Sequence, residues 1–93
     1  MELSSQQKQQ LRKQAHSLSP VVIIGSRGYN EGCQREIDLA LAHHELIKVK
    51  LPAMNKTAQK ELCQTIATST QSHIVQTIGR VLILFRAQEE TSD

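Results

Sequence analysis

The segment Val21-Val22-Ile23-Ile24-Gly25-Ser26-Arg27-Gly28 is the part of this 93-residue chain from which its organisation follows most directly. Its first four residues are apolar and β-branched, which predicts a buried strand. The next four form a Gly-x-x-Gly turn with Arg27 near its tip. Asn30 then supplies a helix N-cap, and Glu31 stands in the first helical turn. The segment therefore predicts a strand, a glycine turn and a helix start in direct succession.

This succession would bring free backbone amides to one place, and phosphate is the commonest biological anion that such a place binds. Two glycines without a Cβ would let a bulky sugar-phosphate chain approach the backbone closely. Gly-x-x-Gly is also common in ordinary connecting turns. The motif by itself leaves two interpretations open, a phosphate-binding loop and a plain turn before a capped helix.

The hydrophobic pattern of the whole chain predicts three helices and four strands in the order α-β-α-β-α-β-β. Strand–helix–strand segments favour parallel neighbours, whereas a hairpin is antiparallel. We therefore expect an α/β chain of the α+β two-layer type, with a mixed four-stranded sheet packed with three helices. The expected helices run from Ser4 or Ser5 to a stop before Pro20, from about 31 to 43, and from 56 to about 68. The expected strands are 21–24, 46–51, 73–78 and 81–85, the last two joined by a type II′ turn at Gly79-Arg80.

Length and composition indicate a single domain over residues 1–88. No apolar run approaches the roughly 20 residues that cross a bilayer, and the first residues have no signal-peptide core. We therefore expect a cytoplasmic protein without membrane contact. Cys33 and Cys63 match no zinc spacing, and we expect both to be small buried side chains on helix faces.

The net charge of +2 conceals an uneven distribution. Glu89, Glu90 and Asp93 hold three of the nine acids, and they form what we expect to be a frayed acidic tail over 89–93. The rest of the chain carries 11 basic and 6 acidic residues, a net charge of +5. Such a body would attract a polyanion, although an ordinary solubilising surface has a similar charge.

Residue patterns for catalysis are missing from the sequence. The four histidines (His16, His43, His44 and His73) have no metal-binding spacing with a cysteine or carboxylate. Ser26 lacks the Gly-x-Ser-x-Gly pattern of a nucleophile elbow, and no Walker-type lysine and serine follow the glycines. We therefore expect no enzymatic activity, metal, cofactor or small-molecule substrate.

Five segments in a fixed order carry a family resemblance: Leu18–Gly28, Glu31-Gly32, Glu36–Leu41, His44–Lys50, and Val75–Arg80 with Leu84-Phe85-Arg86. Together they resemble the CRM domain, the chloroplast RNA splicing and ribosome maturation module, over roughly residues 2–87. The single-domain length is similar to the bacterial stand-alone form, which is associated with precursors of the large ribosomal subunit. Tyr29, Thr70–Ser72, Phe85 and the acidic tail depart from the usual pattern.

The resemblance implies RNA binding without a catalytic site. It also implies a fold similar to the C-terminal domain of bacterial translation initiation factor three. The RNA-contact loop of the family corresponds here to Gly25, Ser26, Arg27 and Gly28.

Basic side chains elsewhere in the chain could extend that contact. Lys48 and Lys50 share one face of their strand, where they either meet phosphates or only face solvent. Arg12 would join them if the first helix packs near the loop. Arg86 could flank the sheet or only blunt its edge. Arg35 could face the loop, but we favour a surface ion pair with Glu31 or Asp38.

The two aromatic residues, Tyr29 and Phe85, are too few for a base-stacking platform, so we expect recognition of the RNA backbone and shape. Tyr29 either stacks on a base or packs as a staple on the second helix. Our first hypothesis is a monomeric, non-catalytic protein that binds structured ribosomal precursor RNA during large-subunit assembly. The alternative is a small protein-interaction module that docks on a ribosomal protein or assembly factor.

Overall fold

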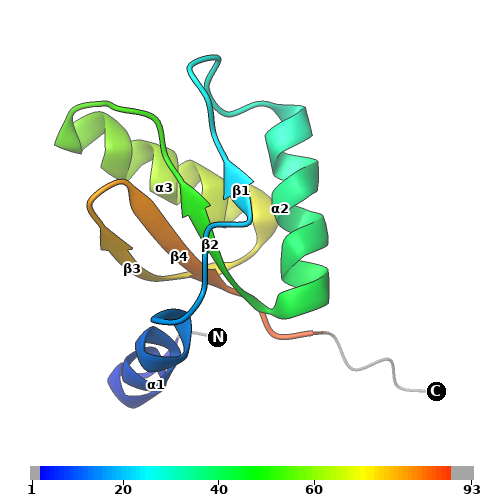
Figure 1. The fold of residues 1–93 in the computed structure, drawn as a ribbon, viewed down its shortest axis with the longest axis vertical. Coiled ribbons are helices and arrows are strands. Elements are labelled where there is room, and N and C mark those ends of the chain that lie inside the picture. Colours follow the sequence, from blue (N-terminus) through cyan, green and yellow to red (C-terminus); the bar gives the residue numbers. More distant parts are fainter. Residues whose placement is uncertain (1–2, 89–93) are drawn as a thin grey trace.

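The computed structural model describes residues 3–88, and their elements follow the predicted order (Figure 1). The helices are α1 (Ser5–Ala15), α2 (Glu31–His44) and α3 (Lys56–Thr70), and the strands are β1 (Val22–Ile23), β2 (Leu46–Lys50), β3 (His73–Ile78) and β4 (Val81–Phe85). The strands form one sheet in the order β1-β2-β4-β3. β1 and β2 are parallel, and the other two pairs are antiparallel. The predicted α+β fold with a mixed sheet and three helices is confirmed. The expected tail, 89–93, lies outside the described residues.

Element ends differ from the prediction for local reasons. α1 ends at Ala15, well before Pro20. The amide of the C-cap residue His16 donates to the carbonyl of Lys13, three residues earlier, so the last turn is of the 3₁₀ type. α3 continues to Thr70, whose hydroxyl donates to the carbonyl of Ile66. Gln71 then adopts a left-handed conformation that caps the helix.

One face of the sheet packs against α2 and α3. The core on this side contains Ile37 and Leu41 from α2, Ile66 from α3, and alternate residues of the strands such as Val49 and Leu82. These five side chains are all fully buried. The period-2 and period-3.6 patterns of the sequence thus converge on the same layer.

The other face of the sheet carries α1 (Figure 1). Leu11 and Ala15 of this helix pack against Leu46, Val75 and Ile83. Val75 reaches this side because β3 has an irregularity between Ile74 and Gln76, which shifts the register by one residue. The first helix therefore adds a smaller third layer opposite the one formed by α2 and α3, so the two-layer arrangement expected from the sequence is wrong.

β4 lies at the centre of the sheet, between β2 and β3. β2 and β3 run in the same direction, as their crossover predicts, but they are not neighbours. All five residues of β4 are apolar, and its three middle residues are almost completely buried. A strand with apolar side chains on both faces is stabilised most in the middle of a sheet that has helices on both sides.

Three connections meet at one end of the sheet. The parallel β1 and β2 end there, and the antiparallel β4 begins there. The 25–28 loop, the 51–55 segment and the 79–80 turn therefore lie along the same end, and the amide of Leu51 donates to the carbonyl of Arg80 at 2.7 Å. This arrangement positions the candidate site.

The two cysteines occupy different environments. Cys63 is buried in the core, as expected, whereas Cys33 is only partly buried. Because burial disfavours the thiolate, it raises the pKa of the Cys63 thiol above its ordinary value. In the unfolded chain the Cys63 thiol has its ordinary pKa. Its contribution to folding stability is therefore fully present below that ordinary pKa and is lost as the pH rises through the folded-state pKa.

We predict that a thiol reagent at mildly alkaline pH modifies Cys33 quickly and Cys63 only after unfolding, because only a thiolate that reaches water reacts. The measurement is the rate of thiol modification in the native chain and in the Cys33→Ser variant. Fast modification of Cys63 in folded Cys33→Ser would contradict the prediction.

Candidate nucleic-acid interface

The glycine loop projects from the end of the sheet between β1 and α2 (Figure 1). The amide of Gly28 donates to the carbonyl of Gly25 at 3.0 Å and closes a four-residue turn. Gly28 has φ +82°, a backbone conformation that residues with a Cβ rarely adopt. Ser26 and Arg27 form the exposed tip.

The loop leaves backbone donors free. Among the hydrogen bonds of residues 3–88, none has the amide of Gly25, Ser26 or Arg27 as its donor. A Cβ built at Gly25 would meet nothing within 4 Å, so the space beside the Cα of Gly25 is open. Three amides of the turn therefore have no acceptor among residues 3–88, while the amide of Gly28 holds the turn together.

The start of α2 adds less to this anion site than the sequence suggests. The side chain of Asn30 accepts from the amide of Cys33 at 3.0 Å, and the carboxylate of Glu31 lies in the first turn. Cap and carboxylate already satisfy part of the positive helix end. The free amides of the loop are consequently the main donors.

Tyr29 anchors the base of the loop. Its ring packs against the core, and its hydroxyl lies 2.7 Å from the hydroxyl of Ser69 on α3. Gln34 of α2 also donates to the carbonyl of Ser69 at 3.2 Å. Of the two roles considered for Tyr29, the structure favours packing, with α3 as the hydrogen-bond partner.

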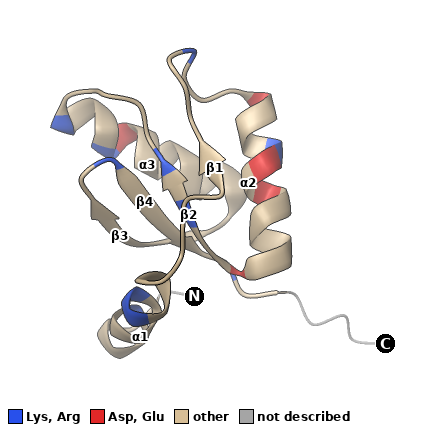
Figure 2. Cartoon of the chain, in the orientation of Figure 1, with Lys and Arg blue, Asp and Glu red and all other residues tan. Residues whose placement is uncertain are grey.

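Charge is unevenly distributed over the surface (Figure 2). Among residues 3–88, four of the five acids lie on α2 or at its C-cap, and the fifth is Glu61 on α3. Nine of the eleven basic residues lie elsewhere, on α1, the 25–28 loop, β2, α3 and the 79–80 turn: Lys8, Arg12, Lys13, Arg27, Lys48, Lys50, Lys56, Lys60 and Arg80. The loop and the sheet therefore present positive charge on the side away from α2.

The predicted site residues divide into two groups around this surface. Lys50 is exposed at the end of β2 and pairs in register with Ile23, just before the loop. Lys48 lies further from the loop, where its ammonium donates to the carbonyl of Leu18 at 3.0 Å. Arg12 lines a groove with Lys48, and α1 lies at the opposite end of the molecule from the loop (Figure 1). Arg12 thus joins Lys48 rather than the loop.

Arg80 belongs to the loop end of the molecule, although sequence reasoning did not include it among the site residues. It is exposed in the β3–β4 turn, directly beside the end of β2. The signal was present, because this position was predicted to be in a turn. Only the strand order shows that the turn lies beside Lys50.

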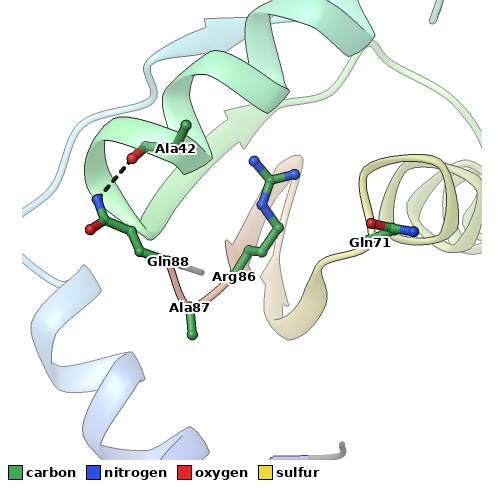
Figure 3. Close-up of a pocket in the computed structure, with 5 residues that line it drawn as sticks. All are labelled: Ala42, Gln71, Arg86, Ala87 and Gln88. Atoms are coloured by element: carbon green, nitrogen blue, oxygen red, sulfur yellow. Dashed lines mark hydrogen bonds between the residues drawn. The ribbon is translucent and has the colours of Figure 1, made fainter. Parts of the chain in front are cut away.

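Arg86 bonds to other parts of the fold at the end of the sheet opposite the glycine loop. Its guanidinium donates to the carboxylate of Asp38 at 2.8 Å, to the carbonyl of Asp38 at 3.0 Å and to the carbonyl of Thr70 at 2.8 Å. It points into a cavity of about 710 Å³ between α2 and the end of α3 (Figure 3). RNA contact by Arg86 stays a prediction, and we leave this side chain out of the interface.

Asp38 therefore has a different partner from the one expected. We predicted an ion pair of Arg35 with Glu31 or Asp38, but the one ion pair among residues 3–88 joins Arg86 and Asp38. Arg86 follows β4 directly and reaches Asp38 across 48 residues of sequence, and the carbonyls of Asp38 and Thr70 fix its planar donor group.

A single α+β module with a glycine loop at one sheet end, and with its acids concentrated on one helix, has the general features of a nucleic-acid-binding domain. The chain belongs to the CRS1/YhbY (CRM) domain family, whose model matches residues 3–86. The resemblance noted in the sequence is thereby confirmed.

Two relatives and one solved structure are similar to this chain over most of their length. The chain is 46% identical over 88 residues to an RNA-binding protein of Haemophilus influenzae, covering 95% of this chain and 89% of that protein. It is 36% identical over 86 residues to a protein of Pseudomonas aeruginosa named a probable RNA-binding protein, covering 92% and 83%. The solution structure of a Staphylococcus aureus protein, described as a candidate RNA-binding protein, superposes with a TM-score of 0.84 at 37% identity, covering 98% and 95%.

Two features are absent from the described residues 3–88. Within this range, no group of three or more histidine, cysteine, aspartate or glutamate side chains could hold a metal ion. None of the described helices is long and apolar enough to cross a membrane.

We predict that Arg86→Met lowers the free energy of unfolding by about 1–3 kcal/mol, because it leaves the carbonyl of Thr70 and the carboxylate of Asp38 without their donor. The measurement is urea denaturation. Arg35→Met is the matched control, since it removes the same charge from the exposed surface of α2 and should change stability by less than about 0.5 kcal/mol. Equal effects of the two substitutions would show that the contacts of Arg86 contribute nothing.

Proposed function

We propose that this chain is a non-catalytic RNA-binding protein whose Gly25–Gly28 loop holds phosphate groups of the RNA. The observation that carries the proposal is the set of three free amides beside the open space at Gly25, with the guanidinium of Arg27 at the same tip. Backbone amides and arginine are the donors that proteins use most often for phosphate oxygens.

The positive end of the sheet supports this assignment. Lys50 and Arg80 adjoin the loop end and have no acidic partner among residues 3–88. The acids of α2 lie on the far side of the loop from them (Figure 2). An RNA strand on the loop would therefore be attracted toward the sheet and repelled from α2.

The manner of recognition follows from the aromatic content. Tyr29 is held by the core and Ser69, and Phe85 is packed beside α1, so neither is free to serve as a stacking surface. Binding would then depend on phosphate contacts and RNA shape, with a strong dependence on salt.

The family and the names of its relatives support RNA as the partner. The resemblance to the bacterial stand-alone form extends the proposal to structured ribosomal precursor RNA, bound by a monomer in the cytoplasm during large-subunit assembly. The salt dependence of binding distinguishes this role from docking on a ribosomal protein or assembly factor.

We predict that Gly25→Glu weakens binding to a structured fragment of large-subunit ribosomal RNA by about tenfold or more, because the new carboxylate would stand where a phosphate binds. Gly25 has no positive φ and its Cβ has open space, so the variant should fold. Gly28 is less suitable, since any side chain there strains the backbone. The measurement is fluorescence anisotropy, with circular dichroism as the folding check.

The matched control is Thr65→Glu, which adds the same charge on the exposed surface of α3 and should change affinity by less than about threefold. Arg27→Gln should also lower the slope of log affinity against log salt by about 0.7–0.9, as expected for the loss of one phosphate contact. Unchanged affinity in Gly25→Glu would refute the loop assignment, and affinity independent of salt would favour a protein partner.

A further inference from the structure

A row of four side chains, three of them exposed, crosses all four strands on the face that carries α1. Strand register joins Ile23 to Lys50, Lys50 to Val81, and Val81 to Ile78. Residues paired in register point to the same side of a sheet, and Val81 lies two residues before Ile83, which α1 covers. α1 covers only part of this face, so Ile23 remains 67% exposed and Ile78 57% exposed.

A groove of about 490 Å³ lies between α1 and this face of the sheet. Ile78 is the exposed apolar residue of the groove, Ile83 is buried beneath it, and the basic rim consists of Arg12, Lys13 and Lys48. Cations around an apolar floor match the two halves of a nucleotide, a phosphate and a flat base.

We propose that this groove receives one unpaired nucleotide of the bound RNA, with its base on Ile78 and its phosphate on the basic rim. The proposal rests on the RNA-binding function above and adds a second contact, between α1 and the sheet.

The charges in the groove are available for a phosphate. The ammonium of Lys48 gives one of its three hydrogens to the carbonyl of Leu18 and keeps two for a ligand. Arg12 uses only its Nε, for a weak bond of 3.4 Å to the carbonyl of Lys8. No aspartate or glutamate lines the groove, so nothing in it repels an anion.

Base accessibility favours an unpaired nucleotide over a duplex. The faces of paired bases are hidden in the stack, so only a base outside a helix can lie on Ile78. The amides of Gln9 and Gln76 also line the groove and can bond to the edges of such a base.

The exposed row connects this groove to the loop. Lys48 and Lys50 are two residues apart on the same face of β2, and Ile23 pairs with Lys50 just before Gly25 begins the turn. An RNA strand that leaves the loop can therefore follow the exposed part of the sheet to the groove, past one lysine after another.

The test uses two RNA hairpins that share one stem sequence. In the first hairpin a 4-thiouridine is bulged out of the stem, and in the second the same 4-thiouridine is paired. We expect the chain to bind the bulged hairpin about tenfold more tightly, because burying the base on apolar surface contributes on the order of 1 kcal/mol. Ultraviolet cross-linking should join the bulged base to peptides of residues 5–16 or 73–83.

Two variants probe the groove, and one probes the same helix outside it. Ile78→Thr should lower affinity for the bulged hairpin about fivefold and leave the paired hairpin unchanged, since it removes apolar surface from the floor. Lys13→Gln should reduce the preference for the bulge, whereas Lys8→Gln, which removes the same charge outside the groove, should retain it. Lys13 and Ile78 are exposed, so the variants should fold, and circular dichroism checks this.

Equal affinity for the two hairpins, equal effects of Lys13→Gln and Lys8→Gln, or cross-links confined to other peptides would overturn the groove proposal. In each of these cases RNA binding that is sensitive to Gly25→Glu would leave the loop function standing. Failure of both hairpins and of the ribosomal fragment to bind would reject the proposed function itself, and the groove proposal with it.

Discussion

The pairing of β1 with β2 is the contact on which the candidate site depends. β1 has only two residues in register, Val22 with Val49 and Ile23 with Lys50. Backbone bonds from the amides of Val21 and Ile24 to β2, at 3.0 and 2.8 Å, extend this short strand at both ends. The buried side chains of Val22 and Ile24 hold it on the core. The glycine loop follows at once, so its position relative to the basic end of the sheet is determined by these few interactions.

Acidic and basic side chains are concentrated on different parts of the fold. α2 is amphipathic, and its buried residues face the core while its acids remain on the outside. One of these acids, Asp38, is held by Arg86 at the end of the sheet far from the loop. The remaining acids of α2 have no basic partner within residues 3–88, and the lysines of β2 have no acidic partner there. A polyanion therefore encounters a molecule that attracts it on one side and repels it on the other.

Much of the fold could be predicted from local patterns. The expected strand 46–51 and the expected helix from 56 to about 68 agree with β2 and α3 to within one or two residues, and Asn30 caps α2 as expected. Strand order could not be predicted with the same ease, because the central position of β4 follows from helices on both faces. The separation of Arg12 from the loop depends on which face of the sheet α1 covers, and the ion pair of Arg86 depends on a residue 48 positions away. Both are tertiary contacts, which short-range periodicity in the sequence does not predict.

The two edges of the sheet have a consequence for how copies of the chain meet. β1 is too short to template another strand, and β3 is broken by the irregularity between Ile74 and Gln76, so neither edge is long and flat. Edges of this form resist the strand-to-strand addition that leads to fibrils. The molecule can thus display bare isoleucines on an open sheet face without giving its neighbours a backbone ladder to extend.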